Sequence, residues 1–287
     1  MGYLYFQPPE PEPLPHPNGY DDLVAAGEML KGEVPDEANG RLTLAECREF
    51  VSANREALDR GRLGLTRECR VPTEYSSIWL QATHMDQTIV ARELARAFCV
   101  QGELANLEKR PADAASNYLT AIKMGPMLAR GGLMIDGRVA ISCEAMGERR
   151  LEREIQNLNI EQSRQLIAEL EKVESEQEPP AQILKHEKMW VRGLHIGFAG
   201  VGMYVSLAIA NRSLNPIGAS RKGHLSKYQA GLQWASQLKA KLAAHAYALE
   251  HGRLPASWTD LVPGYLKSVP TVPFGPADTN RLSFQAD

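Results

Sequence analysis

The sequence lacks the motifs that identify the common classes of enzymes and metal proteins. Its 287 residues contain no GxSxG nucleophile elbow, no P-loop and no HExxH zinc motif, which argues against α/β-hydrolases, P-loop nucleotide hydrolases and zincins. His186-Glu187 lacks a second histidine one turn later, and Gly200-Val201-Gly202 lacks the third glycine of a dinucleotide-binding loop. We therefore expect neither a metal nor another cofactor, and no enzyme activity is indicated.

Cysteines are scarce and widely separated. The four thiols belong to Cys47, Cys69, Cys99 and Cys143 and include no CxxC pair, so neither a zinc ribbon nor a thioredoxin-type redox site is indicated. We expect buried free thiols, because an unpaired cysteine packs as a small apolar side chain. A bridge between Cys47 and Cys69 is the alternative if the protein is exported.

The chain has no large excess of charge of either sign. Its net charge is −3, so no nucleic-acid partner is expected. The distribution is uneven, because residues 1–40 hold eight acidic side chains and one lysine, whereas residues 179–287 hold twelve basic and five acidic ones. The basic third could face an acidic partner or anionic lipid, or its charges could simply coat solvated helix faces.

No uncharged run clearly reaches the length of a membrane span. The longest, residues 194–210, has 17 residues, whereas a spanning helix needs about 20. We expect a buried central helix here, with a segment that dips into a membrane as the alternative.

The amino-terminal residues are rich in proline and cannot form a regular helix. Six prolines stand among residues 8–17, and such a run makes an extended, stiff spacer. Aromatic residues precede it at Tyr3, Tyr5 and Phe6, and tyrosine is favoured at the membrane interface. Residues 1–18 are therefore interpreted as a spacer that follows a membrane anchor upstream of Met1. A frayed end or a tag remnant is the alternative.

The remaining sequence has the periodicity of helices. Apolar residues recur every three or four positions, Thr43 with Glu46 forms a capping-box pattern, and Pro111 stands at a favoured first helical position. Loops are expected at 61–74 and 213–223. The predicted helices are 21–31, 43–58, 77–108, one from Pro111, 133–150, one from Asn159 to Glu176, one from Pro180 through Trp190, and 225–250.

These elements predict an all-α fold. We expect one helical domain over 19–287, with helical hairpins in 19–178 and long helices in 179–287. The hairpins could form an array or a bundle. The carboxyl end is expected to form a Pro-rich tail on the long helix, with a small β-hairpin as an option near the end.

One segment, residues 95–128, resembles a single tetratricopeptide repeat. The resemblance rests on small or aromatic residues at the spacing of that repeat, namely Gly102, Ala114, Tyr118, Ala121 and Pro126. Small residues allow two antiparallel helices to approach closely, and Tyr118 would fill the space between them. No second copy is visible at a distance of 34 residues, so an isolated hairpin within a larger domain is the alternative to a repeat array.

A second segment, residues 245–275, resembles the region after the long helix of type II secretion pseudopilins. The shared pattern is Gly252-x-x-Pro255, Leu261-Val262-Pro263-x-Tyr265-Leu266 and Val269-Pro270 before Pro273-Phe274. Val272 departs from the aspartate usual in that family. The resemblance implies that Ser257 caps a short helix, that Pro263 ends it, and that Tyr265, Leu266 and Phe274 pack on the long helix.

Together, the spacer, the helical core with Arg130-Gly131-Gly132-Leu133 and the carboxyl-terminal pattern resemble a group of uncharacterised bacterial membrane-anchored proteins. That resemblance implies an architecture without a known activity. It places the protein in the cell envelope, anchored to the inner membrane and facing the periplasm.

Two sets of polar residues are candidate sites. Arg221, Lys222 and Lys227 lie near Gly218 and Gly223 and could bind an anion or a lipid headgroup, although a solvated basic loop would have the same composition. Acid–base groups would be available if a set of ionisable residues were buried together, but surface positions or ion pairs are expected instead for Asp136, Glu144, His186 and Glu187.

The sequence therefore favours a non-enzymatic, membrane-tethered scaffold or adaptor that binds an unidentified protein partner outside the cytoplasm. An accessory component of a type II secretion or pilus-like assembly is the first alternative. An enzyme with an unrecognised helical active site is the second.

Overall fold

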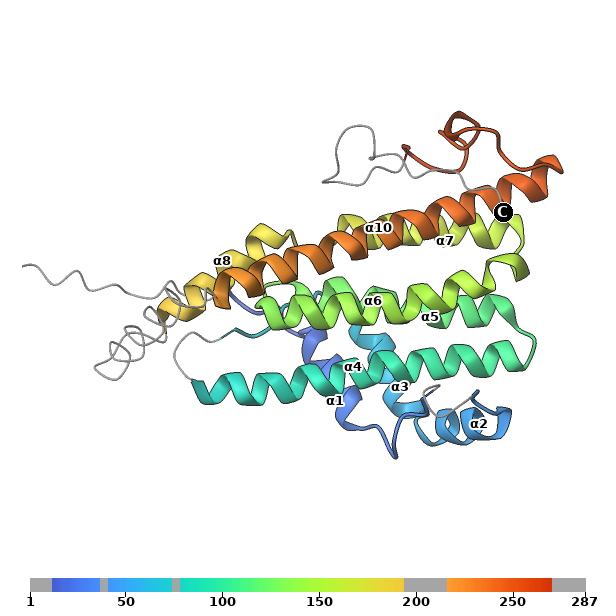
Figure 1. Cartoon of the computed structure of the whole chain (residues 1–287). Coiled ribbons are helices and arrows are strands. Elements are labelled where there is room, and N and C mark those ends of the chain that lie inside the picture. Colours follow the sequence, from blue (N-terminus) through green and yellow to red (C-terminus); the bar gives the residue numbers. More distant parts are fainter. Residues whose placement is uncertain (1–11, 37–40, 74–77, 194–215, 270–287) are drawn as a thin grey trace, which may run out of the picture.

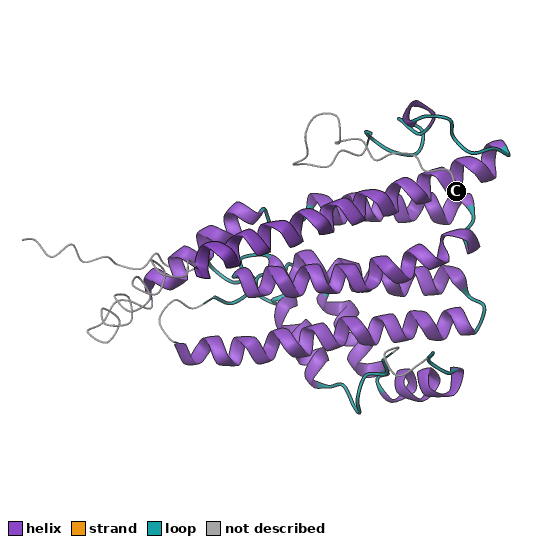
Figure 2. Ribbon diagram, viewed as in Figure 1, coloured by secondary structure: helices purple, strands orange, loops and turns teal. Residues whose placement is uncertain are grey.

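The computed structural model describes residues 12–36, 41–73, 78–193 and 216–269, and this part of the chain is helical without strands (Figures 1 and 2). The all-α prediction is confirmed, while the optional β-hairpin lies outside the described residues. The α-helices are α1 (Gly19–Glu28), α2 (Leu44–Ala53), α3 (Arg55–Gly64), α4 (Ile78–Leu107), α5 (Pro111–Ala129), α6 (Met134–Glu154), α7 (Ile160–Ser175), α8 (Pro180–Gly193) and α10 (Pro216–His251). Two short 3-10 turns, Ile155–Asn157 and Trp258–Asp260, complete them.

The helices are stacked in layers. Helices α4, α5 and α6 run up and down beside one another, with α1, α2 and α3 against α4 on one side (Figure 1). On the other side, α10 packs on both α6 and α7, α7 also contacts α5, and α8 lies along the first part of α10. Most buried apolar side chains form one continuous core through these layers.

Local sequence signals set several helix ends where they were predicted. Thr43 and Glu46 form the capping box that starts α2, with the Thr43 N–H 2.8 Å from the Glu46 carboxylate. Asn159 and Gln162 start α7 in the same way, through two hydrogen bonds of 2.9 Å. Pro111 occupies the first turn of α5. Each motif satisfies backbone groups that a helix end leaves free, so it acts without tertiary contacts.

Tertiary contacts override the sequence pattern at Asn54. The predicted helix 43–58 is divided there into α2 and α3. The Asn54 side chain is 1% exposed and pairs with the backbone of Lys31, accepting from its N–H at 2.6 Å and donating to its carbonyl at 3.1 Å. A buried amide thus fastens the end of the α1 segment to the break between the two helices.

Parts of two predicted loops are helical instead. Residues 61–64 belong to α3. A Cβ atom at Gly61 would lie only 3.0 Å from side-chain atoms of Leu94 and Phe98 on α4, and one at Gly64 would lie 3.0 Å from the Gly19 carbonyl oxygen on α1. The missing side chains let the backbones approach, so these glycines serve packing rather than chain reversal. Residues 216–223 are the first turns of α10 rather than a loop.

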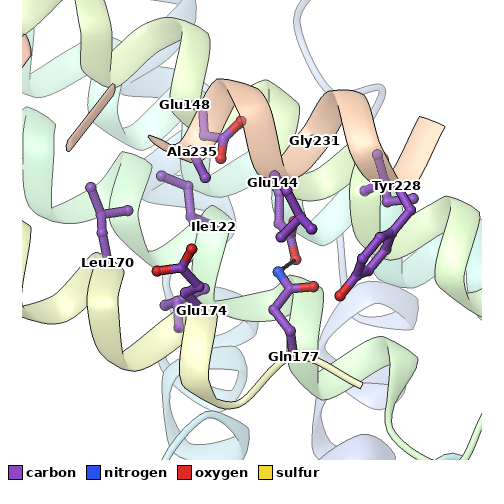
Figure 3. Close-up of a pocket in the computed structure, with 12 residues that line it drawn as sticks. Ile122, Glu144, Glu148, Leu170, Glu174, Gln177, Tyr228, Gly231 and Ala235 are labelled. Carbon is purple, nitrogen blue, oxygen red and sulfur yellow. Dashed lines mark hydrogen bonds between the residues drawn. The ribbon is translucent and has the colours of Figure 1, made fainter. Parts of the chain in front are cut away.

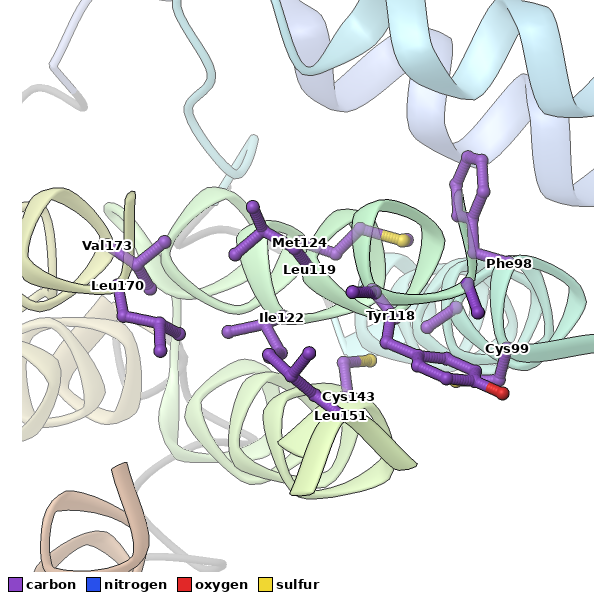
Figure 4. Packing of buried hydrophobic residues seen from close by; sticks show 14 of the residues in the cluster. Phe98, Cys99, Tyr118, Leu119, Ile122, Met124, Cys143, Leu151, Leu170 and Val173 are labelled. Atoms are coloured by element: carbon purple, nitrogen blue, oxygen red, sulfur yellow. The ribbon is translucent and has the colours of Figure 1, made fainter. Parts of the chain in front are cut away.

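The α4–α5 hairpin contains the residues of the tetratricopeptide-like segment. Gly102 on α4 faces the Tyr118 ring on α5, and a Cβ atom at position 102 would lie 2.3 Å from that ring. Ala114, Ala121 and Pro126 are buried in α5. Tyr118 is 1% exposed and lies near Cys99 and Cys143, as Figure 4 shows. All four cysteines are free and buried, as predicted.

The carboxyl-terminal tail packs on the long helix α10. Leu261 and Leu266 are buried in the main core, and the Tyr265 ring meets Tyr247 of α10 edge-on at 5.8 Å between centroids. The short turn Trp258–Asp260 follows directly after Ser257, where a short helix was expected. Phe274 lies outside the described residues.

Candidate functional site

The predicted anion site lies on the first turns of α10. Arg221, Lys222 and Lys227 all belong to this helix, and Lys227 is exposed. The surrounding sequence is unusually free of opposing charge, since no acidic residue occurs between Glu187 and Glu250. This 62-residue stretch contains eight Lys or Arg residues, and it includes the end of α8 and nearly all of α10. On α8, Lys185 and Lys188 are exposed as well.

The described end of the Pro-rich spacer is fixed to the body by Arg70. The Glu12 carboxylate forms an ion pair with the Arg70 guanidinium. The Asn18 side chain donates to the Arg70 carbonyl at 2.9 Å and accepts from the Arg70 N–H at 3.0 Å. Asn18 also caps α1 by accepting from the Tyr20 N–H at 3.2 Å. The spacer therefore meets the helical body at a defined place.

The spacer meets the body at the end of the molecule where α8 ends and α10 begins (Figure 1). A series of contacts connects the two. The side chain of Arg70 packs on Gly131, and the Val71 N–H donates to the Arg130 carbonyl at 2.9 Å. Three residues after Gly131, the Met134 N–H donates to the Glu187 carboxylate of α8 at 3.0 Å.

Within the described residues, no helix combines the length and apolar character that crossing a membrane requires. Residues 194–210, the longest uncharged run, lie outside the described part of the chain, so neither interpretation of that run is tested.

A buried acidic cluster is the second polar feature. Glu144 and Glu148 lie one turn apart on α6 and are 7% and 3% exposed. They border a small cavity of about 20 Å³ between α6, α7 and α10, together with Glu174, Gln177 and Tyr228 (Figure 3). This is room for about one water molecule. Gln177 donates to Glu144 at 2.7 Å.

Burial changes the ionisation of both carboxyl groups. Desolvation, with a further contribution from Glu148, raises the pKa of Glu144 to about 8 against the opposing hydrogen bond from Gln177. Desolvation also raises the pKa of Glu148 to about 7, although Arg149 lowers it. Both groups therefore change charge near neutral pH. Glu144 was one of the acid–base candidates in the sequence, whereas Glu148 was not singled out. Ala140, Gly147 and Leu151 share their helix face, and that apolar spacing was a usable signal of burial.

A third polar network connects α1, α4 and α6. His84 lies 2.6 Å from an Asp136 carboxylate oxygen through Nε2, and its Nδ1 lies 3.5 Å from the Tyr20 hydroxyl. The other Asp136 oxygen accepts from the Leu133 N–H at 2.7 Å, at the start of α6. Asp136 is 1% exposed. The arrangement connects three helices through buried polar side chains.

The four acid–base candidates are mostly buried, but they are not brought together. Surface positions or ion pairs were expected: Asp136 is buried but pairs with His84, whereas Glu144 and His186 are buried at 7% and 8% exposed. Asp136 and Glu144 are eight residues apart on one helix, which separates them by about 12 Å along its axis. Glu187 accepts a backbone hydrogen bond at α6. These four residues therefore make separate contacts within the helical body and do not form one site.

An open groove of about 880 Å³ runs along α1 and α3. Its charges are largely balanced within the protein, because Asp22 pairs with both Arg60 (3.4 Å) and Arg67, while Asp59 pairs with Arg62 at 3.3 Å. The remaining charged groups along it are again of both signs, at Lys31, Arg55 and Glu56. The groove therefore shows no strong preference for an anion or a cation.

Comparison with known proteins adds no assignment. No protein-family model matches the chain, and no curated protein sequence or solved structure is similar enough to count as a match. Among the described residues, no three His, Cys, Asp or Glu side chains are grouped as metal ligands. Function is therefore argued from the geometry of the basic end and of the buried clusters.

Proposed function

We propose that this protein is a non-enzymatic helical scaffold, tethered to a membrane on the periplasmic side and oriented with the end of α8 and the start of α10 toward the lipid. In this arrangement the spacer leads to an anchor in the bilayer. Basic residues on α8 and α10 contact anionic headgroups, and the rest of the helical body is presented to a protein partner.

The observation that carries the proposal is the shared location of the spacer and the acid-free helices. Glu12 and Asn18 hold the spacer on Arg70, at the end of the molecule where α8 ends and α10 begins. A tether that leaves from this end would bring Lys227 and its neighbours close to the membrane. Each Lys or Arg near an anionic surface contributes about 1 kcal/mol of attraction.

The opposite end differs in charge and would point away from the membrane. There the α10 end and the tail carry acidic groups that pair with basic ones, for example Glu250 with Arg164 at 2.7 Å and Glu171 with Lys267 at 2.8 Å. These pairs leave little net charge to attract lipid. The exposed Leu249 and Leu254 lie in this region and would be available to a partner.

Binding to lipid vesicles tests the orientation. The chain is mixed with vesicles of phosphatidylcholine alone or with phosphatidylglycerol added, and the bound fraction is measured by co-sedimentation at low and high salt. We expect binding only to the anionic vesicles, weakened by salt because screening shortens the range of the attraction. Reversing three charges with Arg221→Glu, Lys222→Glu and Lys227→Glu should weaken binding at least about 100-fold, given about 1 kcal/mol per residue.

A matched control places the same three charge reversals at the other end, with Lys109→Glu, Arg253→Glu and Lys267→Glu. This control variant should bind the vesicles nearly as well as the unmodified chain. Equal weakening by both sets of reversals would show that net charge alone governs binding, and the proposed orientation would be wrong. Equal binding to neutral vesicles would contradict it as well.

A further inference from the structure

The cluster around Glu144 contains more acidic than basic groups. Three carboxylates border the same small cavity, at Glu144, Glu148 and Glu174, and one ammonium group, that of Lys239, pairs with Glu174. Glu144 and Glu148 are the two that are buried, whereas the Glu174 side chain is 42% exposed. Lys239 is therefore engaged by Glu174, and the basic group that favours ionisation of a buried carboxyl group is Arg149, which acts on Glu148.

The helices around the cluster supply little compensating charge. Helix α5 contributes Ile122 to the cavity and Gly125 against the Glu144 carboxyl group, and neither carries charge. On α6 itself, Arg149 favours the charged form of Glu148 and Glu152 opposes it. The other titratable groups facing the cluster are Glu174 on α7, Glu178 after it, and Tyr228 and Lys239 on α10.

The contact at Gly125 prevents simple relief by movement of Glu144. A Cβ atom at position 125 would lie 2.0 Å from a Glu144 carboxylate oxygen, so the carboxyl group fills the space of a missing side chain. The cavity holds about one water molecule and cannot hydrate two anions. Ionisation of both groups in this position is costly, because a buried charge needs a partner or water.

The structural element best able to yield is the first half of α10. It covers the cluster with Tyr228, Gly231 and Ala235. The nearest side-chain atom to a Cβ at Gly231 is 3.7 Å away on Ile141, so contact there is ordinary rather than interlocked. Movement of this half of α10 would admit water to both carboxyl groups.

We propose that Glu144 and Glu148 form a pH-sensitive latch, which holds the first half of α10 against α6 when they are protonated and releases it when both ionise. The consequence for lipid contact rests on the proposed function, because the released half carries Arg221, Lys222 and Lys227. The latch itself is a property of the helical body and requires no membrane.

Hydrogen exchange measured by mass spectrometry tests the latch in the full chain without vesicles. Exchange of α10 peptides within 216–240 is compared at pH 6 and pH 9, after correction for the intrinsic pH dependence of amide exchange. The raised pKa values of about 8 and 7 predict that the opening equilibrium increases by about tenfold or more across this interval. Peptides from the core of α4 serve as an internal reference and should show no such increase.

Substitutions separate the latch from general alkaline loosening. The variant Glu144→Gln with Glu148→Gln cannot ionise and should keep α10 protected at pH 9. Each single substitution should remove part of the dependence, which provides a test if the double variant does not fold. The control Glu169→Gln changes a partly exposed carboxylate on α7 that pairs with Lys123 at 2.6 Å, and it should retain the full dependence.

Two results would overturn the proposal. One is an unmodified chain whose corrected exchange in α10 is the same at both pH values. The other is a double variant that still loosens at pH 9. Because no lipid is present, either result leaves the vesicle experiment unaffected, and failure of vesicle binding would equally leave this test intact.

Discussion

Tyr118 on α5 occupies the space left by the missing side chain of Gly102 on α4. A Cβ atom at position 102 would lie 2.3 Å from one ring carbon and 2.6 Å from the next, whereas carbon atoms in contact prefer about 3.5–4.0 Å. The backbone of the same residue packs closely on α6, because a Cβ atom at Gly147 would lie 2.5 Å from the Tyr118 carbonyl oxygen. One aromatic residue thus fixes the separation of three helices.

The substitution Gly102→Ala should destabilise the protein despite the better helix propensity of alanine. Overpacking of a filled core costs about 1–3 kcal/mol, which exceeds the gain of about 1 kcal/mol from removing a helical glycine. The measurement is the free energy of unfolding from urea denaturation. Gly223→Ala is the matched control, since a Cβ there meets nothing within 4 Å in α10, and it should leave stability unchanged or increase it.

The substitution Asp136→Asn should lower stability most at acidic pH. Burial lowers the pKa of His84, but the hydrogen bond and charge of Asp136 outweigh this effect and raise the pKa above its usual 6.5. The pair therefore adds stability that is fully present below pH 6.5 and is lost as pH rises through the folded-state pKa. Asparagine keeps an oxygen for the Leu133 N–H, so the helix start is retained.

Urea denaturation of both proteins at pH 5.5 and pH 9 measures this difference. Loss of one partner of a buried pair costs about 3–5 kcal/mol, so we expect a deficit of that order at pH 5.5 and a smaller one at pH 9. A deficit of the same size at both pH values would show that His84 is not protonated in the folded state. Comparing the unmodified protein with the variant at the same pH cancels the contribution of Glu144 and Glu148 to the free energy of unfolding, because both proteins contain these residues.

The substitution Asn18→Ala should release the spacer from the body. It removes the cap of α1 and both hydrogen bonds to the Arg70 backbone. A lost cap costs about 1 kcal/mol, and two further bonds at a buried site add about 1 kcal/mol each. Faster hydrogen exchange in residues 12–28, with little change in α7, is the expected result. Uniform acceleration across the chain would indicate global destabilisation instead.

The cysteines should be inert until the protein unfolds. All four are buried, and burial raises the pKa of Cys47 to about 11 and of Cys69 to about 12. Since the thiolate is the reactive form, the native protein should react slowly with Ellman's reagent at pH 8. Four thiols should react rapidly in guanidinium chloride. Fewer than four under those conditions would show that a disulfide had formed.

The sequence was informative where a structural choice depends on neighbours in the chain. The capping box of Thr43 and Glu46 and the position of Pro111 predicted helix ends correctly, because they act on backbone groups a few residues away. The free, buried cysteines were also predicted. At the carboxyl end, the resemblance to pseudopilins anticipated the turn after Ser257 and the packing of Leu266.

The sequence was misleading where distant elements make the choice. Asn54 divides a helix because Lys31 supplies backbone partners, and Gly61 stays helical because Phe98 lies against it. Glu144 was expected at the surface, yet α7 and α10 cover it. None of these partners is close in sequence, so no local pattern could reveal them.

The amino-acid sequence by itself determined the all-α class, most helix positions and the concentration of basic residues in α8 and α10. These follow from periodicity, capping and composition, which are properties of short segments. Only the tertiary structure decided which charges are buried and which end of the molecule holds the spacer. Burial of Glu144 and Glu148 depends on helices that pack on α6 from later in the chain, and the free energy of desolvating a charge exists only once those helices are in place.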